Sequence, residues 1–174
     1  MTNTQLNYLV AQLDRHKDQF EVLFSQVEEE HIRWKVAPEK WCPLEIVCHL
    51  YDEERLDFRT RTKLLLKDPD SKLPPFNPLE WVTAHRYMEQ SYEGMLKLFL
   101  EERDKSIEWL RSLDETAPWQ HEQPHPRLGK LTPSFFLTNW VAHDLLHLRQ
   151  LIRWRYDLTQ QYLQMDVSYA GNWV

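Results

Sequence analysis

Glycine is scarce in this sequence, with only three glycines among 174 residues. Tight β-hairpin turns depend on glycine for backbone conformations with positive φ, so this scarcity argues against a fold built from hairpins. Residues of high helix propensity, above all leucine, glutamate, glutamine, lysine and arginine, are plentiful. A chain of this length can bury roughly two thirds of the surface that its unfolded form exposes. We therefore expect one all-α domain over residues 1–174.

Cysteines and long apolar runs are rare as well. The two cysteines, Cys42 and Cys48, are too few for a disulfide framework, and their separation matches neither a CxxC zinc clip nor a redox motif. Nowhere is an apolar run long enough to span a membrane, and the first residues lack the apolar core of a signal peptide. These features favour a soluble cytoplasmic protein without a membrane partner.

Positive charge is in deficit. The formal net charge is −6 and the isoelectric point is near 5.7. The overall field of such a protein repels a phosphate backbone, so we expect no nucleic-acid partner.

Apolar residues recur at helical spacing in four regions, and prolines mark the borders of these regions. Pro43 suits the first turn of the second region, whereas Asn77 and Thr132 suit the caps before the third and fourth. We expect helices over residues 4–30, 43–67, 78–113 (with a break near Ser91) and 133–156. The tail after Tyr156 has no sustained period and is expected to pack as a strap over the bundle.

These elements predict a four-helix bundle. Long loops rich in proline and polar residues lie on either side of the third helix, at about residues 68–77 and 114–131. Loops of this length leave room for a crossover connection.

The fourth helix contains the stretch WVAHDLLHLRQLIRW, residues 140–154, in which His143 and His147 stand four residues apart. Side chains at this spacing share one face of a helix. The same face carries apolar residues, namely Phe136, Trp140, Leu151 and Trp154. Two imidazoles in an apolar interior cannot readily both be charged, and each neutral ring offers one lone pair. A divalent metal would satisfy both rings, but hydrogen bonds to carbonyl or carboxylate groups in an ordinary core would also do so. The HExxH signature of zinc proteases is absent.

A metal site needs a third ligand, and periodicity alone leaves its identity open. On a helical wheel His49 lies away from the apolar arc of its helix and would be a surface residue. His121 and His125 share a proline-rich loop, which places ligands less reliably than a helix does. The other histidines stand among polar residues and are expected to be solvated: His16, His31 and His85.

Two patterns together resemble the DinB-like superfamily, which includes the bacillithiol S-transferases. They are W-x-x-x-E-I-x-x-H-L over residues 41–50 and H-D-x-x-H-x-x-Q over residues 143–150, and the resemblance spans most of the chain. It implies a four-helix bundle with a metal site built from one histidine of the second helix and two of the fourth. The matching ligands are His49, His143 and His147. One departure is Cys42, which replaces the small polar residue of the family and weakens the expected helix cap.

The resemblance also implies a function. A low-molecular-weight thiol would be activated on the metal and would attack an electrophilic acceptor, as in a thiol S-transferase, or the protein would be a related hydrolase. Zinc or nickel is the expected ion, with iron or manganese as alternatives. The rival hypothesis is a non-catalytic metal-binding or partner-binding bundle, for example one that acts in a stress response. A homodimer is expected from the family.

Side chains that hydrogen-bond to the imidazole rings should orient them. Asp52 and Glu53 can be reached from His49 along the same helix, although solvated surface acids are the simpler interpretation of both. Asp144 is turned away from His143 and is expected to contact a neighbouring helix. No catalytic residue is assigned from the sequence.

Overall fold

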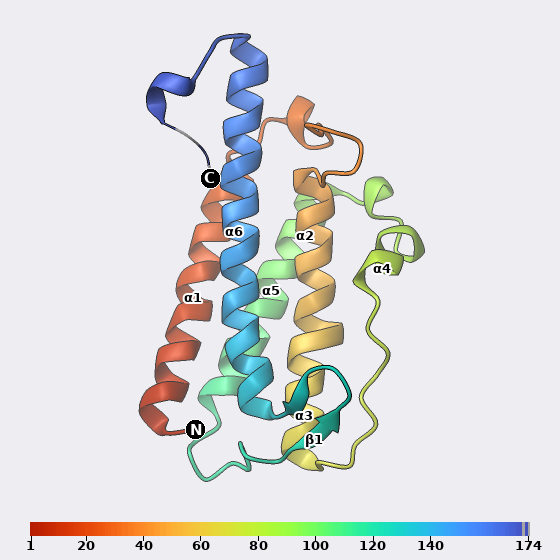
Figure 1. Ribbon diagram of the computed structural model, residues 1–174, viewed down its shortest axis with the longest axis vertical. Helices are drawn as coiled ribbons and strands as arrows, with labels where there is room; N and C mark the ends of the chain where they lie inside the picture. The colour runs from red at the N-terminus through yellow and green to blue at the C-terminus, as the bar shows by residue number, and fades with distance from the viewer. Residues whose placement is uncertain (172, 174) are drawn as a thin grey trace.

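Four long helical segments run along one axis of the molecule in the computed structural model, which describes residues 1–171 and 173 (Figure 1). The elements are α1 (Asn3–Ser25), η1 (Glu29–His31), α2 (Pro43–Asp52), η2 (Glu53–Phe58), α3 (Arg59–Lys67), α4 (Pro78–Ala84), η3 (Tyr87–Glu89), α5 (Tyr92–Arg111), β1 (Gln123–His125), β2 (Gly129–Leu131), α6 (Pro133–Leu163) and η4 (Ser168–Ala170). The predicted all-α four-helix bundle is confirmed. In the part of the chain that the structure describes, no helix combines the length and apolar character that crossing a membrane requires.

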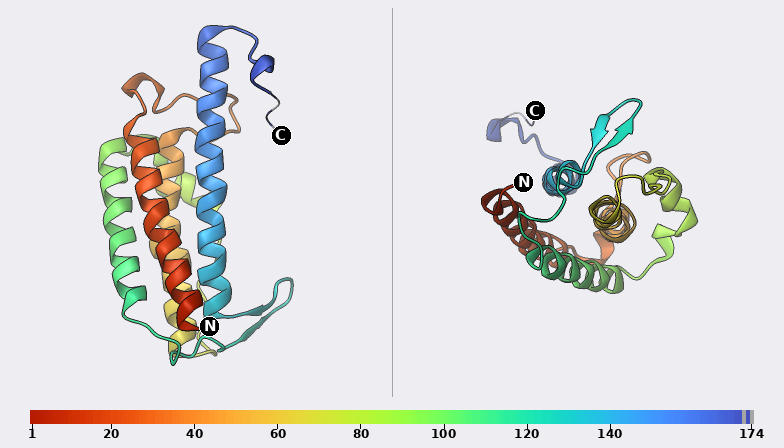
Figure 2. Two further views of the ribbon diagram at one scale, coloured as in Figure 1. Left: turned by 90° about the vertical axis from the view of Figure 1, so that its left-hand side faces the viewer. Right: turned by 90° about the horizontal axis from the view of Figure 1, so that it is seen from below.

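The bundle contains a crossover. Helices α1 and α6 run upward in Figure 1, whereas the α2–α3 segment and α5 run downward. Because α3 and α5 follow one another in parallel, the connection over residues 68–91 must return along the outside of the bundle, as Figure 1 shows at its right-hand side. Helix α5 packs against α1 and α2, and α6 packs against α1 and α3, in the cyclic order seen from below in Figure 2. The long loop before α5 therefore makes the predicted crossover, whereas the loop over residues 112–132 joins the antiparallel helices α5 and α6 at the lower end of the bundle.

Two of the predicted helix borders have side-chain caps. The Ser91 hydroxyl accepts a hydrogen bond from the Gly94 backbone N–H at 3.2 Å, and this confirms the break predicted at Ser91. Thr132 accepts from the Phe135 N–H at 2.9 Å and begins α6 where predicted. Asn77 precedes α4, but its side chain makes no capping hydrogen bond.

The helix predicted over residues 43–67 has the expected extent but is not uniform. Its middle section, η2, is a π-helix that joins α2 to α3. A π-helical turn contains an extra residue and so shifts the faces of the helix on either side of it. Four side chains of this section are buried, namely Glu53, Glu54, Asp57 and Phe58.

Both ends of the chain differ from the sequence prediction. Helix α1 ends at Ser25 rather than near Glu30, and a short 3₁₀ turn follows. Helix α6 continues to Leu163, beyond the predicted end at Tyr156, and projects past the other helices (Figure 2). A projecting helix needs no apolar face, so its last turns show no sustained period.

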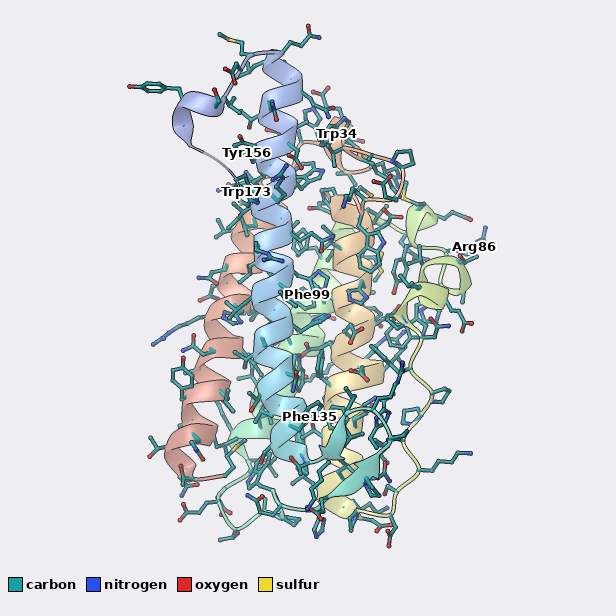
Figure 3. All side chains as sticks on the ribbon, viewed as in Figure 1. Trp34, Arg86, Phe99, Phe135, Tyr156 and Trp173 are labelled. Atoms are coloured by element: carbon teal, nitrogen blue, oxygen red, sulfur yellow. The ribbon has the colours of Figure 1, made fainter. Side chains whose placement is uncertain are left out.

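The predicted strap is therefore wrong for residues 157–163, which continue α6. The tail after α6 does fold back, but not across the bundle. After α6 the chain folds back, and the Trp173 ring comes within 5.3 Å of the Tyr156 ring, as Figure 3 shows near the upper end of α6. This segment packs on α6 itself rather than over the bundle. Asn172 and Val174 of the tail lie outside the described residues.

The loop after α5 contains a small antiparallel hairpin of β1 and β2, which the sequence analysis did not predict. Its turn is completed by Gly129, whose φ of 77° lies in the left-handed region that glycine adopts readily. The hairpin pairs three residues with three, so the fold remains all-α in class.

The core consists of two large apolar clusters with a polar layer between them, and of a small third cluster of Leu65, Leu131 and Phe136. The upper cluster includes Phe20, Leu44, Phe99 and Leu151, of which Phe99 is labelled in Figure 3, and the lower cluster includes Leu6, Phe58, Leu110 and Trp140. Between them lie four buried polar side chains, which we call the polar layer: His16, Glu54, Arg103 and Asp144. The layer stands at the height of the predicted metal ligands, so a polar centre is built into the middle of the bundle.

Candidate metal centre

The three histidines that the resemblance implied converge on one point. His49 comes from α2, and His143 and His147 come from α6. The Nε2 atom of His143 lies 3.3 Å from Nε2 of His49 and 3.1 Å from Nε2 of His147. One ring nitrogen of each histidine lies within 4.8 Å of the other two. Two helices that are distant in sequence thus present three nitrogens to a common point.

The spacing of these nitrogens suits a metal ion. Three imidazole nitrogens bound at about 2.0–2.1 Å would stand about 2.9 Å apart in an octahedral site and about 3.3 Å apart in a tetrahedral one. The two shortest distances observed, 3.1 and 3.3 Å, fall in this range. Across residues 1–171 and 173, this is the one group of three or more histidine, cysteine or acidic side chains that meets the geometry for holding an ion.

Gln150 sets the tautomer of His147. Its Oε1 atom lies 2.8 Å from Nδ1 of His147, and an amide oxygen can only accept a hydrogen bond. The proton of His147 therefore sits on Nδ1, and the lone pair is on Nε2, where the three rings meet. A partner of this kind is typical of metal-ligating histidines.

Burial keeps the three rings neutral. It lowers the pKa of His49 to about 2, with the neighbouring histidines adding to the effect, and it lowers the pKa of His143 to about 3. The pKa of His147 is also lowered, again by burial. All three rings are therefore neutral at physiological pH, which is the form that binds a metal.

Aromatic rings surround the centre. The Trp41 ring lies 4.7 Å from the His49 ring and stacks on His147 at 6.3 Å, while Phe58 lies 5.2 Å from His143. Behind these walls His49 and His147 are buried, and His143 alone of the three histidines keeps partial exposure. The open side of the centre is therefore at His143.

The helix that carries His49 is buried on every side. All residues from Cys42 to Leu50 are buried, because α5, α4 and η3 pack around α2. The helical wheel wrongly predicted a surface position for His49, since it assumes a solvent-facing side that α2 lacks; the side chain is only 4% exposed. At the start of α2, Glu45 accepts a hydrogen bond from the Cys42 N–H at 3.0 Å, so the glutamate holds the helix start despite the cysteine.

Glu53 lies against the centre, and the expectation that it would be a solvated acid is wrong. Its side chain belongs to the π-helical section and is 2% exposed, with Oε1 3.6 Å from Nε2 of His49. The other carboxyl oxygen, Oε2, is buried and has no hydrogen-bond partner among the described residues. Burial, together with the nearby charge of Asp57, raises the pKa of Glu53 to about 9.

Asp52 is also buried, so the solvated interpretation fails for it as well, but it faces away from the three rings. It accepts a hydrogen bond from the Tyr87 hydroxyl at 2.8 Å and pairs with His85 at 2.6 Å and with Arg55 at 2.9 Å. Asp52 therefore ties the crossover segment to α2 and does not orient His49.

The contact predicted for Asp144 is confirmed. Arg103 of α5 donates to both of its carboxyl oxygens, at 2.6 and 2.8 Å. His16 of α1 reaches the same carboxylate at 3.2 Å and is 3% exposed, so the prediction that His16 is solvated was wrong. A signal was present, because His16 lies three residues after Leu13 and four before Phe20, on the inward stripe of α1.

The remaining histidines lie outside the centre. The His85 side chain is 38% exposed, as predicted, whereas that of His31 is only 17% exposed, so the solvated position predicted for His31 holds only in part. His121 donates to the Leu65 carbonyl at 2.9 Å, and His125 accepts hydrogen bonds from backbone N–H groups of its own turn. Each of the two loop histidines therefore has a backbone partner outside the centre.

Two solved structures share the fold. YfiT from Bacillus subtilis, described as a probable metal-dependent hydrolase with an unusual four-helix bundle topology, is similar with a TM-score of 0.77 and 16% identity, over 95% of this chain and 91% of that chain. TT2238, described as a four-helix bundle protein, is similar with a TM-score of 0.57 and 19% identity, over 85% of this chain and 98% of that chain. At these identities the likeness concerns the fold alone.

No curated protein matches the chain. The family model of the DinB superfamily matches residues 12–151, a range that includes all three histidines of the centre, the α2–α3 segment and α5 in full, and most of α1 and α6. The sequence patterns around His49 and His143, the crossed bundle and the family match agree, and this chain belongs to the DinB superfamily.

Proposed function

We propose that this protein is a metal-dependent enzyme, a thiol S-transferase or a related hydrolase, that works at the three-histidine centre. The observation that carries the proposal is the convergence of three neutral ring nitrogens at distances that suit a metal. Three protein ligands leave positions free for water or substrate, as in catalytic rather than structural sites. The partial exposure of His143 gives such a position a route to solvent.

When bound, a divalent ion, zinc or nickel with iron or manganese as alternatives, would lower the pKa of a thiol or water held beside it. His49, His143 and His147 would hold the ion, and Gln150 would keep the lone pair of His147 directed at it. The aromatic walls from Trp41 and Phe58 would limit the access of bulk water.

Glu53 is the proton acceptor in this proposal. Its Oε1 atom lies beside His49, and its Oε2 atom is free of other partners among the described residues. A positive charge at the three nitrogens would lower the raised pKa of Glu53. A group that takes up and returns a proton works best when its pKa lies near the working pH.

The proton balance of the transfer is simple. The thiol loses its proton to Glu53, and its sulfur forms a bond to an electrophilic carbon of the acceptor. The bond from that carbon to the leaving group breaks with its electron pair, and Glu53 returns the proton to the leaving group. In hydrolysis, which the description of YfiT supports, water takes the place of the thiol.

The experiment is a turnover assay of protein reconstituted with each candidate ion, using small thiols with chlorodinitrobenzene as the acceptor and ester or amide substrates without thiol. We expect turnover that is lost on chelation, restored by the ion and abolished in His143→Ala. Full activity of the metal-stripped protein would contradict the proposal. Thiol-dependent turnover supports the transferase, and thiol-independent turnover supports the hydrolase.

A non-catalytic role is the second candidate. The centre joins α2 to α6, so an ion there would cross-link two helices and stabilise the bundle. A large fall in melting temperature on chelation, with no turnover of any acceptor or hydrolysable substrate, would favour this structural role over catalysis.

We also propose a homodimer. Apolar side chains are exposed along neighbouring faces of α1 and α6, including Val22 (52%), Leu145 (53%) and Ile152 (46%). A second copy would cover them. Light scattering should give the mass of two chains for the wild type and of one chain for Ile152→Glu; a monomeric wild type would contradict this part of the proposal.

A further inference from the structure

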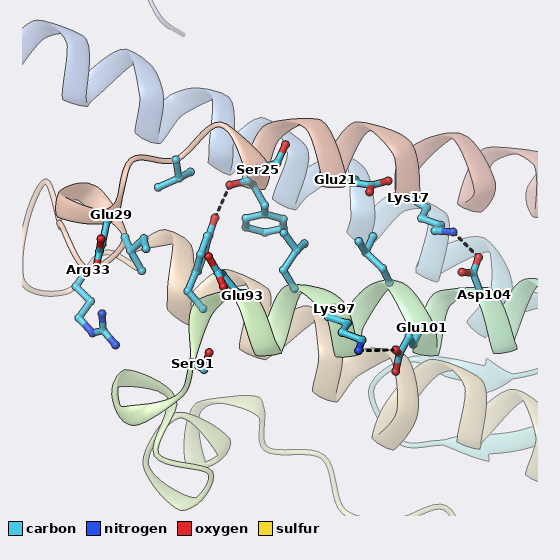
Figure 4. A pocket seen from close by; sticks show the side chains of 16 residues that line it. Lys17, Glu21, Ser25, Glu29, Arg33, Ser91, Glu93, Lys97, Glu101 and Asp104 are labelled. Atoms are coloured by element: carbon cyan, nitrogen blue, oxygen red, sulfur yellow. Dashed lines mark hydrogen bonds and ion pairs between the residues drawn. The ribbon is translucent and has the colours of Figure 1, made fainter.

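A groove with a volume of about 930 Å³ lies between α1 and α5, and we call it the α1/α5 groove (Figure 4). None of the three histidines of the centre lines it. The groove follows α5 from Ser91 to Asp104, which corresponds to a length of about 20 Å at the helical rise per residue. A groove of this length between two helices has the shape that accepts a third helix.

The floor of the α1/α5 groove is apolar. Phe24 is fully buried, whereas Val27, Leu96 and Leu100 are half-buried and pack on the upper apolar cluster. Leu96 and Leu100 stand four residues apart on α5, so they lie next to each other on one face of the helix. An apolar surface that covered this floor would remove it from water, and that burial is favourable.

Acidic side chains stand on both rims of the groove. Glu21 extends from α1 and Glu93 from α5, as Figure 4 shows, and Glu29 of η1 lies at one end. All three side chains are exposed. None of the three forms an ion pair within the described part of the chain, where the ion pairs of the groove join other residues.

The cations of the groove do not neutralise these three carboxylates. Lys17 pairs with Asp104 at 2.5 Å and Lys97 with Glu101 at 3.9 Å, as the dashed lines in Figure 4 mark. Arg33 donates to backbone carbonyls rather than to an acid. Five acids and three cations line the groove, so it carries an excess of negative charge that a cationic partner would complement.

This arrangement suits a polypeptide rather than a metal ion, a nucleic acid or a lipid surface. In the part of the chain that the structure describes, no three carboxylates of the groove stand close enough together to hold an ion. Negative rims repel the phosphates of a nucleic acid and of anionic lipid headgroups. An apolar strip between polar rims is typical of protein–protein interfaces.

We propose that the α1/α5 groove binds an amphipathic helix of a partner protein, with an apolar face for the floor and with lysine or arginine on both sides of that face. The apolar residues of this helix would contact Leu96 and Leu100, and its cations would face Glu21 and Glu93. The groove shares no lining residue with the apolar pocket between α1 and α6, so the proposed homodimer uses other residues. The binding of this helix does not depend on the metal centre.

The test is a titration of the wild-type protein with rhodamine-labelled peptides, followed by fluorescence anisotropy. Each peptide has about fourteen residues, enough to span the groove as a helix. The first consists of leucine and lysine at helical spacing, the second has glutamate in place of lysine, and the third has the composition of the first in an order without an apolar face. We expect the first peptide to bind at least about tenfold more tightly than the other two. Equal binding of the three peptides, or no binding of the first, would overturn the proposal.

Two variants locate the binding site. Glu21→Gln/Glu93→Gln removes the charges of two exposed rim residues and should weaken binding of the first peptide about tenfold at low salt. Ser25→Arg adds bulk and positive charge from an exposed position of the groove and should weaken binding at least as much. The matched control is Glu39→Gln/Glu108→Gln, which changes two exposed acids outside the groove and should bind as the wild type does.

The variants should melt close to the wild-type temperature, because every changed side chain is exposed. Wild-type affinity in Ser25→Arg, or the same loss in the control variant as in the rim variant, would overturn the proposal.

Spermine separates a helix site from a site for small cations. Spermine carries several positive charges but has no apolar face, so it should not displace the first peptide at equal ionic strength. Displacement by spermine at the concentration of the peptide itself would show that charge alone is recognised, and the proposed helix site would be wrong.

Discussion

Arg103 of α5 donates two hydrogen bonds to the carboxylate of Asp144, the residue that follows His143 on α6. The same guanidinium donates through Nε to Glu54 at 2.9 Å, the residue that follows Glu53. One buried cation therefore links the two helical segments that form the centre. Its partner Asp144 is the neighbour of His143, and its partner Glu54 is the neighbour of Glu53, the candidate proton acceptor. The polar layer therefore fixes the position of these two segments, and of the three histidines, relative to each other.

Replacing Arg103 by methionine should destabilise the protein by about 3–5 kcal/mol. The change leaves two buried carboxylates without their cation, and removing one partner of a buried ion pair has a cost of this size. Urea unfolding measures it, with Lys105→Met as a control because Lys105 is exposed on the same helix. A loss below about 1 kcal/mol, similar to that of an exposed pair, would contradict the role given to the polar layer.

Replacing Gln150 by leucine should weaken metal binding by about 10–100-fold, because His147 loses the acceptor that fixes its tautomer. A competition titration with a chromophoric chelator gives the affinity. Gln161→Leu, on the exposed end of α6, is the matched control and should bind metal as the wild type does. Wild-type affinity in Gln150→Leu would show that the hydrogen bond does not orient the ring.

Replacing Glu53 by glutamine should lower turnover by about 10²–10⁴-fold while all three ligands remain in place. Glutamine keeps the shape of the side chain but cannot accept the proton. The metal affinity and the melting temperature should stay close to those of the wild type, which separates a catalytic defect from a structural one. Unchanged turnover with unchanged metal content would remove Glu53 from the mechanism.

The metal-free protein should lose stability as the pH falls below about 6.5. Burial lowers the pKa of His49 to about 2 and that of His143 to about 3 from an ordinary value of 6.5. Between these values the unfolded chain binds more protons than the folded one, so each ring makes unfolding more favourable by up to about 1.4 kcal/mol per pH unit of acidification.

This pH dependence can be measured by urea unfolding of chelator-treated protein at a series of pH values between 7 and 4. The His143→Ala variant supplies the comparison. Its free energy of unfolding should change less steeply with pH, because one ring fewer takes up a proton on unfolding. An identical slope in both proteins would mean that His143 is not held neutral by burial.

Much of the fold could be predicted from helical periodicity and caps. The spacing of four in His143 and His147 already places both rings on one face, and the caps at Ser91 and Thr132 are local signals. The projecting end of α6 could not be predicted in this way, because a helix end that lies beyond the bundle core carries no apolar stripe.

Periodicity could not identify the third histidine of the centre or its acidic neighbour. His49 lies on a helix that is buried all round, so no polar side of α2 distinguishes inward from outward positions, and only the family resemblance identified it. Glu53 begins a π-helical section, and a change in helical type cannot be read from the spacing of apolar residues. His16 did lie on the apolar stripe of α1, but its polar neighbours in sequence suggested an exposed position. Its burial depends on the contact with Asp144, which also pairs with Arg103, and the sequence does not show this contact.

X-ray absorption spectroscopy, with elemental analysis of the same purified samples, shows whether the three histidines bind one ion together. We expect one divalent ion per chain in the wild type, bound by imidazole nitrogens at about 2.0–2.1 Å, and a loss of that ion in His49→Ala, His143→Ala and His147→Ala. A wild-type protein that takes up no ion when it is offered, or a His49→Ala variant that retains its ion with the same spectrum, would contradict this expectation.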